Sequence, residues 1–317
     1  MNNDRYHIKE NAEFLKDLGK KYGNVLNRTT MINFVNDAKE KSSISTSVNF
    51  GIMVKYLVDV LGLFEEIRIY PDNKEPIIRY VAKYISVSPY EIALSLKSKS
   101  FLSHYSALYV HDLTINNPKE IYINTEQTLK PRNEANSKLT QGKIDFAFSK
   151  PMRKTKTTFL FRYNGIMYTV FVLNSKNTRN TGIIKKETFE FSKAINVTNL
   201  ERTLIDVTVR PTYSGGSSEI LEAYKLASLL IDINRMELYL KKFDYIYPYE
   251  KSILLYIKYI GNSVLFENLY KAWYKRIDDN LNFYLDYQIA DSKLDTNLNI
   301  YYPKTFDIQG VLLQSFK

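Results

Sequence analysis

Residues 46–82 read TSVNFGIMVKYLVDVLGLFEEIRIYPDNKEPIIRYVA and combine one helical pattern with two β-rich runs. The first half has apolar residues at helical spacing. Thr46 or Ser47 can cap its start, and Gly62 ends it. The second half holds two runs typical of strands, on either side of the polar turn 71–76. The segment therefore predicts a helix followed by a two-stranded ribbon.

Two further helical patterns precede this segment, at residues 8–22 and 29–38. Helix, helix, turn, helix and ribbon is the layout of a winged helix-turn-helix, whose last helix enters the major groove of DNA. We therefore expect a DNA-binding domain over residues 1–86. Its candidate DNA contacts are Ser47, Asn49 and Lys55 on the last helix, and Arg68, Lys74 and Arg79 on the ribbon. A module for protein contact is the alternative, because residues 1–86 carry a net charge of only +2.

The rest of the chain mixes strands and helices. β-rich runs at 121–123 and 159–161 and an apolar run at 167–173 predict strands, the last of them buried. From Thr198 the pattern becomes helical, and Glu201 three residues later suggests a capping box. The expected fold class is α+β, with a domain over 1–86 and a second domain over 87–317. The second domain is expected to be mixed α/β to about residue 198 and mainly helical after it.

The surplus positive charge of the chain is confined to Thr128–Lys193, which holds 14 Lys and Arg against 4 Asp and Glu. The resulting net charge of +10 equals that of the whole protein. Nucleic-acid phosphates are the commonest partner of so positive a surface. Compositional bias toward Lys is the alternative source, but it would raise Lys throughout the chain. We therefore expect one charged face over the central strands.

Two short segments in this window carry the densest candidate contacts. Residues 151–156 supply Arg153, Lys154 and Lys156 next to aromatic residues, a combination that suits contact with a nucleic-acid backbone. Residues 174–181 add further cations in a polar stretch, namely Lys176 and Arg179.

Several classes of site are excluded by residue type or spacing. The chain has no cysteine, which excludes disulfides, thiolate zinc sites and a cysteine nucleophile. His104 and His111 are seven residues apart, too far along a helix to bind one metal ion together. Ser103 before them is expected to cap a helix. No Gly-rich phosphate loop is present, so no cofactor is expected.

Cellular location follows from two further absences in the sequence. No signal-peptide core follows Met1, and no run reaches the ~18 apolar residues of a membrane span. We therefore expect a cytoplasmic protein with no membrane partner.

Charged residues of the second domain leave one enzymatic alternative open. Glu126, Asp145, Glu201 and Asp206, with Lys143, could form a metal-dependent nuclease centre, although their spacing matches no known motif. Three charged residues at intervals of four positions would lie on one stripe of a helix: Arg202, Asp206 and Arg210. Apolar residues beside this stripe indicate a buried helix whose charges are paired within the protein.

Several strings together resemble a known family. They are LSHYSALYVHDLT (102–114), INTEQ (123–127), LTQGKIDFAF (139–148), PMRKTK (151–156), NLERTLIDVTVRPTYSGG (199–216) and FDYIYPYEKSI (243–253). This set resembles the AbiEi-type antitoxins of type IV toxin–antitoxin systems, which are abortive-infection proteins also described as transcriptional regulators of viral defence. The resemblance covers roughly residues 45–260 and is most specific over 199–216.

The resemblance implies a function without catalysis. Such an antitoxin has an N-terminal winged helix-turn-helix that binds double-stranded operator DNA and represses its own operon. Its C-terminal domain counters a nucleotidyltransferase toxin encoded alongside. Two positions depart from the family pattern: Asp112 stands in place of an expected Gly, and Glu250 in place of an expected His. The alternatives are the metal-dependent nuclease and a protein-interaction module with a basic face.

Overall fold

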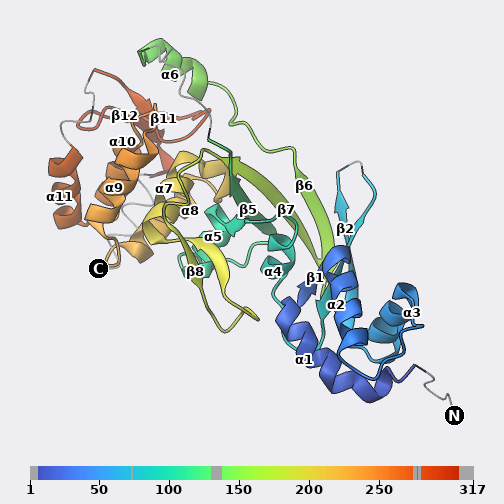
Figure 1. The fold of residues 1–317 in the computed structure, drawn as a ribbon. Coiled ribbons are helices and arrows are strands. Elements are labelled where there is room, and N and C mark those ends of the chain that lie inside the picture. Colours follow the sequence, from blue (N-terminus) through green and yellow to red (C-terminus); the bar gives the residue numbers. More distant parts are fainter. Residues whose placement is uncertain (1–5, 73, 130–137, 274–276, 278–279, 307–317) are drawn as a thin grey trace.

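One mixed sheet runs through the length of the molecule (Figure 1). The structure, a computed structural model, describes residues 6–72, 74–129, 138–273, 277 and 280–306. Over these residues the sheet contains β1 (Val25–Leu26), β2 (Phe64–Pro71), β3 (Ile77–Ala82), β4 (Phe101–Leu102), β5 (Glu120–Glu126), β6 (Thr158–Tyr163), β7 (Ile166–Ser175), β8 (Ile183–Lys186) and β9 (Ile195–Thr198). Their order across the sheet is β1-β3-β2-β6-β7-β5-β4-β9-β8. Parallel and antiparallel neighbours both occur, so the sheet is mixed.

The N-terminal end of the molecule has the predicted order of three helices and a ribbon. The short 3₁₀ turn η1 (Lys9–Asn11) leads into α1 (Ala12–Tyr22), and α2 (Arg28–Glu40) and α3 (Phe50–Lys55) follow. A single π-helical turn, η2 (Tyr56–Val60), extends α3. Strand β1 pairs antiparallel with β3, so that β1, β3 and β2 form the part of the sheet next to α1–α3.

The predicted start of the third helix is wrong by two to three residues. Asn49 caps α3, because its side-chain oxygen accepts a hydrogen bond from the Ile52 N–H at 2.9 Å. Ser47 lies before the helix, and its hydroxyl contacts Ser45 at 2.8 Å. Both residue types favour N-caps, so the sequence alone does not distinguish these positions.

Strands β2 and β6 join the N-terminal elements to the rest of the sheet. They pair antiparallel, with Ile69 opposite Phe161 and Pro71 opposite Phe159. Ile69 and Phe161 are both buried in one hydrophobic core that also contains Val197. Sheet hydrogen bonds therefore connect the two expected domains, 1–86 and 87–317. The boundary between these domains stays a prediction.

The three strands predicted in the middle of the chain are present as β5, β6 and β7. Three short helices accompany them: α4 (Pro89–Leu94), α5 (His104–Val110) and α6 (Gln141–Phe148). The expectation that residues 167–173 form a wholly buried strand is wrong at their start. Met167 is 48% exposed, whereas Val170 is buried.

The C-terminal third is mainly helical, as predicted. It contains α7 (Leu200–Val209), the 3₁₀ turn η3 (Pro211–Tyr213), α8 (Ser217–Ala227), α9 (Ile233–Phe243), α10 (Tyr249–Tyr259) and α11 (Ser263–Trp273). These helices share a second hydrophobic core, at the opposite end of the molecule from α1–α3 (Figure 1). A small sheet packs against them, with strands β10 (Phe283–Tyr284), β11 (Ser292–Asp295) and β12 (Ile300–Pro303).

The predicted capping box of α7 is displaced by one residue. Asn199, not Thr198, caps the helix, and its side chain accepts from the Arg202 N–H at 3.1 Å. Glu201 instead accepts hydrogen bonds from the Asp232 N–H and from Arg235. Over the described ranges, no helix is long and apolar enough to cross a bilayer.

Candidate functional site

A pocket opens between the end of the central sheet and α7. Its cavity has a volume of about 410 Å³. The lining combines cations, polar side chains and aromatic rings: His104, Asn124, Gln127, Arg153, Lys154, Thr155, Leu173, Asn174, Ser175, Lys176, Thr178, Arg202, Asp206, Val209, Arg210, Tyr213, Phe243 and Tyr245. This volume lies within the range of small-molecule sites in proteins. Cationic side chains outnumber carboxylates in the lining.

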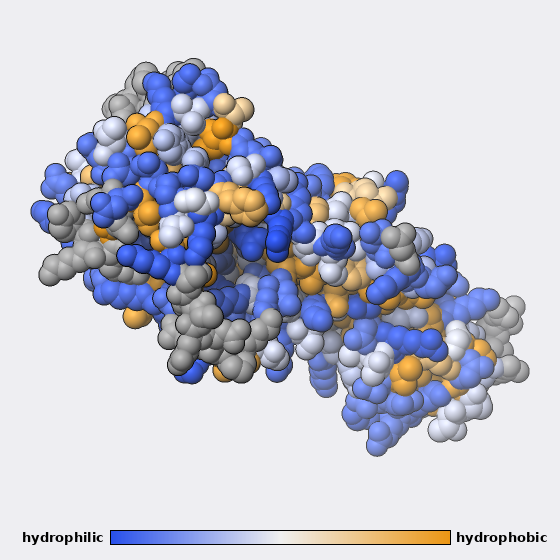
Figure 2. Space-filling view, turned by 90° about the horizontal axis from the view of Figure 1, so that it is seen from above, coloured by the Kyte–Doolittle hydropathy of each residue, from blue (hydrophilic) through white to orange (hydrophobic). Residues whose placement is uncertain are grey.

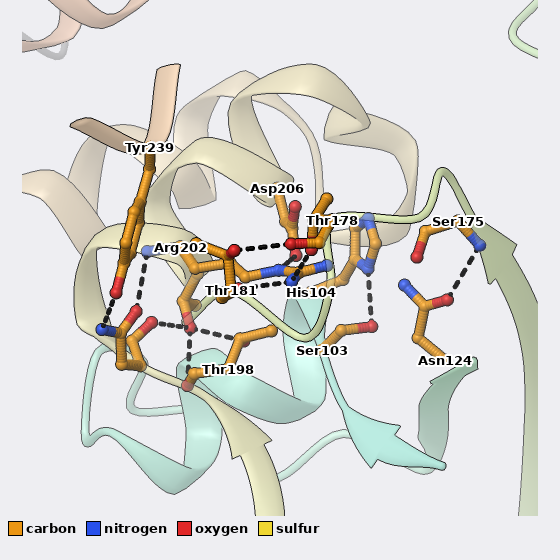
Figure 3. A network of polar contacts seen from close by, with 12 residues as sticks. Ser103, His104, Asn124, Ser175, Thr178, Thr181, Thr198, Arg202, Asp206 and Tyr239 are labelled. Carbon is orange, nitrogen blue, oxygen red and sulfur yellow. Dashed lines mark hydrogen bonds and ion pairs between the residues drawn. The ribbon is translucent and has the colours of Figure 1, made fainter. Parts of the chain in front are cut away.

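Arg202 forms the buried centre of this region (Figure 3). Its side chain is 2% exposed, and its guanidinium donates to Glu126 at 3.0 Å and to Asp206 at 3.4 Å. A third bond from the same group reaches the Thr178 hydroxyl at 2.8 Å. Two aromatic rings, Phe101 and Phe243, lie 5.3 Å from the guanidinium carbon. The predicted pairing of Arg202 with Asp206 on one helical stripe is therefore confirmed.

The two carboxylates that contact Arg202 differ in their electrostatics. Burial alone would raise the pKa of Glu126, but hydrogen bonds from the Asn180 N–H, from Thr178 and from Arg202 lower it overall. Burial raises the pKa of Asp206, and the attraction of Arg202 offsets this effect only in part. Glu126 is thus the stronger anionic partner of Arg202, because several donors converge on it.

His104 forms part of the pocket wall and is held as a neutral side chain. Burial, with Arg210 and Arg202 nearby, lowers the pKa of His104 to about 3. Its Nδ1 lies 2.9 Å from the Ser103 hydroxyl. Ser103 does stand at the N-cap position of α5, but its side chain makes no capping hydrogen bond, which corrects our expectation. The backbone of His104 has φ 52°, a conformation that is strained for a residue with a Cβ.

Four exposed cations surround the mouth of the pocket: Arg153, Lys154, Lys176 and Arg210. The first three were predicted as phosphate contacts, but the sequence assigned Arg210 to an internal pairing. Two of these four side chains donate hydrogen bonds to backbone carbonyl oxygens. Lys176 donates to Phe243 O at 2.8 Å, and Arg210 donates to Arg153 O at 3.3 Å. Within the described part of the chain, none of the four forms an ion pair with a carboxylate.

The candidate DNA contacts at the N-terminal end are mostly exposed. Ser47, Asn49 and Lys55 lie at the surface around α3, and Lys74 lies at the surface of the ribbon turn. Arg68 is also exposed on β2, where it pairs with Glu66 at 3.4 Å.

Arg79 is an exception, because it is buried. Its guanidinium donates to Ser95 Oγ at 2.9 Å, to Ser95 O at 3.0 Å and to Ile78 O at 2.9 Å. Both faces of β3 are covered at this point, one of them by the end of α4, so strand alternation does not bring Arg79 to the surface. The expectation that Arg79 contacts DNA is therefore wrong.

The basic window does not form the single face that we expected. Arg162 lies on the β6–β7 hairpin in the middle of the sheet, whereas Lys186, on the edge strand β8, donates to Val110 O at 2.7 Å. Lys193 reaches Gly23 O at 3.3 Å beside the N-terminal helices. Two of the predicted contacts, Lys156 and Arg179, are exposed but do not line the pocket. The fold spreads one sequence segment over distant strands and loops. On the face seen in Figure 2, hydrophilic residues cover both ends of the molecule.

The carboxylates of the nuclease alternative do not gather around one point. Glu126 and Asp206 contact Arg202, whereas Asp145 on α6 accepts from Gln141 at 2.7 Å and from Tyr284 at 3.0 Å. Across the residues that the structure describes, no group of three or more His, Asp or Glu side chains is arranged to hold a metal ion.

Comparison with known proteins gives a likeness of fold. No protein-family model and no curated protein matches the chain. It is similar to the crystal structure of the RV2827C protein from Mycobacterium tuberculosis, with a TM-score of 0.52 and 10% identity. The match covers 97% of this chain and 95% of that chain. The mixed α+β architecture is thus shared over nearly the whole length of both proteins.

Proposed function

We propose that the protein is a DNA-binding antitoxin of the abortive-infection type, which represses its own operon. The observation that supports DNA binding is the placement of α3. This helix follows α2 after a turn and carries exposed Asn49 and Lys55, and the β2–β3 ribbon with Lys74 follows it. Strand β1 pairs with β3 beside these helices. This arrangement of three helices and three strands supports our proposal that the unit is a winged helix-turn-helix.

In this proposal α3 reads base edges and the ribbon contacts phosphates. The amide of Asn49 and the ammonium of Lys55 suit adenine and guanine edges respectively. Arg68 and Lys74 supply backbone contacts. Because residues 1–86 carry a net charge of only +2, we propose that base contacts contribute more to affinity than bulk charge does.

The experiment measures binding of the full chain to DNA from upstream of its own gene and to a scrambled duplex. We expect Lys55→Gln to weaken binding to the upstream DNA by about tenfold, and to the scrambled duplex much less. Lys271→Gln, at the exposed surface of α11, is the matched control and leaves both affinities unchanged. Equal losses on the two duplexes would contradict the assignment of α3 as the base-reading helix.

The antitoxin part of the proposal is supported by the sequence resemblance, and no catalytic step is assigned to the protein. Its toxin would be a nucleotidyltransferase encoded next to it. We expect co-expression of this chain to restore growth to cells that express the neighbouring gene. Growth arrest that persists at equal levels of both proteins would reject this role.

A further inference from the structure

The inner end of the pocket holds polar groups that the DNA-binding role does not use. Asn124 is 2% exposed, and its amide oxygen accepts from the Ser175 N–H at 3.1 Å. Figure 3 shows its amide nitrogen pointing toward the space beside the His104 ring. The Ser175 hydroxyl borders the same space and is buried without a hydrogen-bond partner. An unsatisfied hydroxyl is costly in a protein interior, so it indicates a missing partner.

The His104 ring adds a third polar group at this end. One ring nitrogen contacts the Ser103 hydroxyl, and the other points away from it in Figure 3. The ring is packed edge-on against Tyr213, with centroids 5.6 Å apart, which fixes its orientation. Together with Asn124 and Ser175, it forms a rigid set of donors and acceptors suited to the polar edge of a flat molecule.

The outer end of the pocket has the opposite character, because it is strongly cationic. Arg153, Lys154, Lys176 and Arg210 surround the mouth. The contacts of Lys176 and Arg210 are to neutral carbonyls, so their positive charges are not cancelled. Arg and Lys groups held in this way bind phosphate oxygens through charge-assisted hydrogen bonds.

We propose that this pocket binds a nucleoside phosphate, with the base at the inner end beside Asn124 and Ser175 and the phosphates among the cations of the mouth. A cavity of about 410 Å³ is large enough for more than an inorganic anion. The rings of Tyr213 and Tyr245 in the lining supply aromatic surface for a base. This site goes beyond DNA recognition, since α3 lies at the other end of the sheet (Figure 1).

The test is calorimetric titration of the full chain with ATP, GTP, CTP and UTP separately, and with adenosine and inorganic tripolyphosphate. We expect at least one nucleoside triphosphate to bind tenfold or more tightly than tripolyphosphate. Arg210→Gln should weaken both nucleotide and tripolyphosphate by about tenfold. Lys185→Gln removes an exposed cation of β8 that does not line the pocket, and should change neither affinity.

A second variant tests the inner end without risk to the fold. Ser175→Ala removes only the unpartnered hydroxyl, so it should leave thermal stability and tripolyphosphate binding unchanged. Nucleotide affinity should fall by about three- to tenfold. Equal affinity for tripolyphosphate and all four nucleotides would overturn the proposal, as would no binding at millimolar nucleotide. Tight binding of a single-stranded oligonucleotide, lost in Arg210→Gln while mononucleotides do not bind, would assign the pocket to a nucleic-acid strand instead.

Discussion

The guanidinium of Arg202 on α7 donates to the carboxylate of Glu126, at the end of β5, across 3.0 Å. The two residues are 76 positions apart in the sequence, and both side chains are buried. This pair joins the central sheet to the C-terminal helices at the wall of the pocket. Asp206 and Thr178 share the same guanidinium, so the charge of Arg202 is compensated on several sides.

Removal of Arg202 should therefore destabilise the protein strongly. Arg202→Met leaves two buried carboxylates without their cation, and we expect it to lower the free energy of unfolding by about 3–5 kcal/mol. Urea denaturation measures the change. Lys20→Met breaks the exposed ion pair with Asp17 and should have little effect. A similar small effect for both variants would mean that the buried network does not stabilise the fold.

Acid should destabilise the protein through His104. Burial lowers its folded-state pKa to about 3, from an ordinary value of 6.5, so the unfolded chain binds the proton more readily. Stability is thus complete above pH 6.5 and is lost as pH falls toward 3, by about 2 kcal/mol at pH 5. His111 shifts in the same direction, again through burial. Unfolding measured from pH 7.5 to 4.5 should show a flatter dependence in His104→Gln, and an unchanged slope would refute the assignment.

Gly182 should not tolerate a side chain. Its φ is 71°, and a Cβ there would lie 2.9 Å from the Arg202 Cβ and 3.0 Å from Asn199 Oδ1. We expect Gly182→Ala to lower the free energy of unfolding by about 2–4 kcal/mol, through backbone strain together with overpacking. Gly165 has a similar φ of 77° but open space around it, so Gly165→Ala should cost only about 1 kcal/mol. Equal losses in thermal or urea unfolding would show that strain alone decides the cost.

Arg79 should contribute to stability and not to DNA binding. Arg79→Met removes the donors to Ser95, so we expect a loss of about 1–3 kcal/mol in the free energy of unfolding. At a temperature where the variant is folded, its affinity for the upstream DNA should equal that of the parent. A loss of affinity in the fully folded variant would restore Arg79 to the DNA-contacting surface.

Salt dependence separates the true phosphate contacts from the others. For Arg68→Gln and Lys74→Gln, we expect the slope of log affinity against log salt to fall by about one each. Binding to upstream and scrambled DNA should weaken alike. The test is fluorescence anisotropy between 50 and 200 mM salt, with Arg79→Met as the variant whose slope stays constant. Unchanged slopes would place the ribbon away from the phosphates.

Sequence patterns predicted most elements of the fold but placed their ends less well. Apolar spacing identified the helices before the ribbon. β-rich composition identified β5 and β6, and an apolar run identified β7. Helix starts were missed by one to three residues, because residues suited to capping stand close together, as at Ser47 and Asn49 and at Thr198 and Asn199. The small sheet at residues 283–303 had no recognisable pattern, since its strands are very short.

The pocket was only partly visible from sequence. Arg153 and Lys154 stood out in one cationic segment and Lys176 in another, whereas Asn124 and Ser175 gave no signal because isolated polar residues are common. Arg210 was assigned to an internal pairing, since helical spacing brings it into line with Asp206. In the structure it lies just past the end of α7 and faces the pocket mouth.

Local patterns in the sequence determined the α+β class, the order of helices and strands and the pairing of Arg202 with Asp206, because these depend on neighbours a few residues apart. Tertiary structure decided the rest. The pairing of β2 with β6, the burial of Arg79, the spread of the basic window and the approach of Glu126 to Arg202 all depend on contacts between distant segments. Such contacts follow from how the sheet and helices pack, which no local spacing encodes.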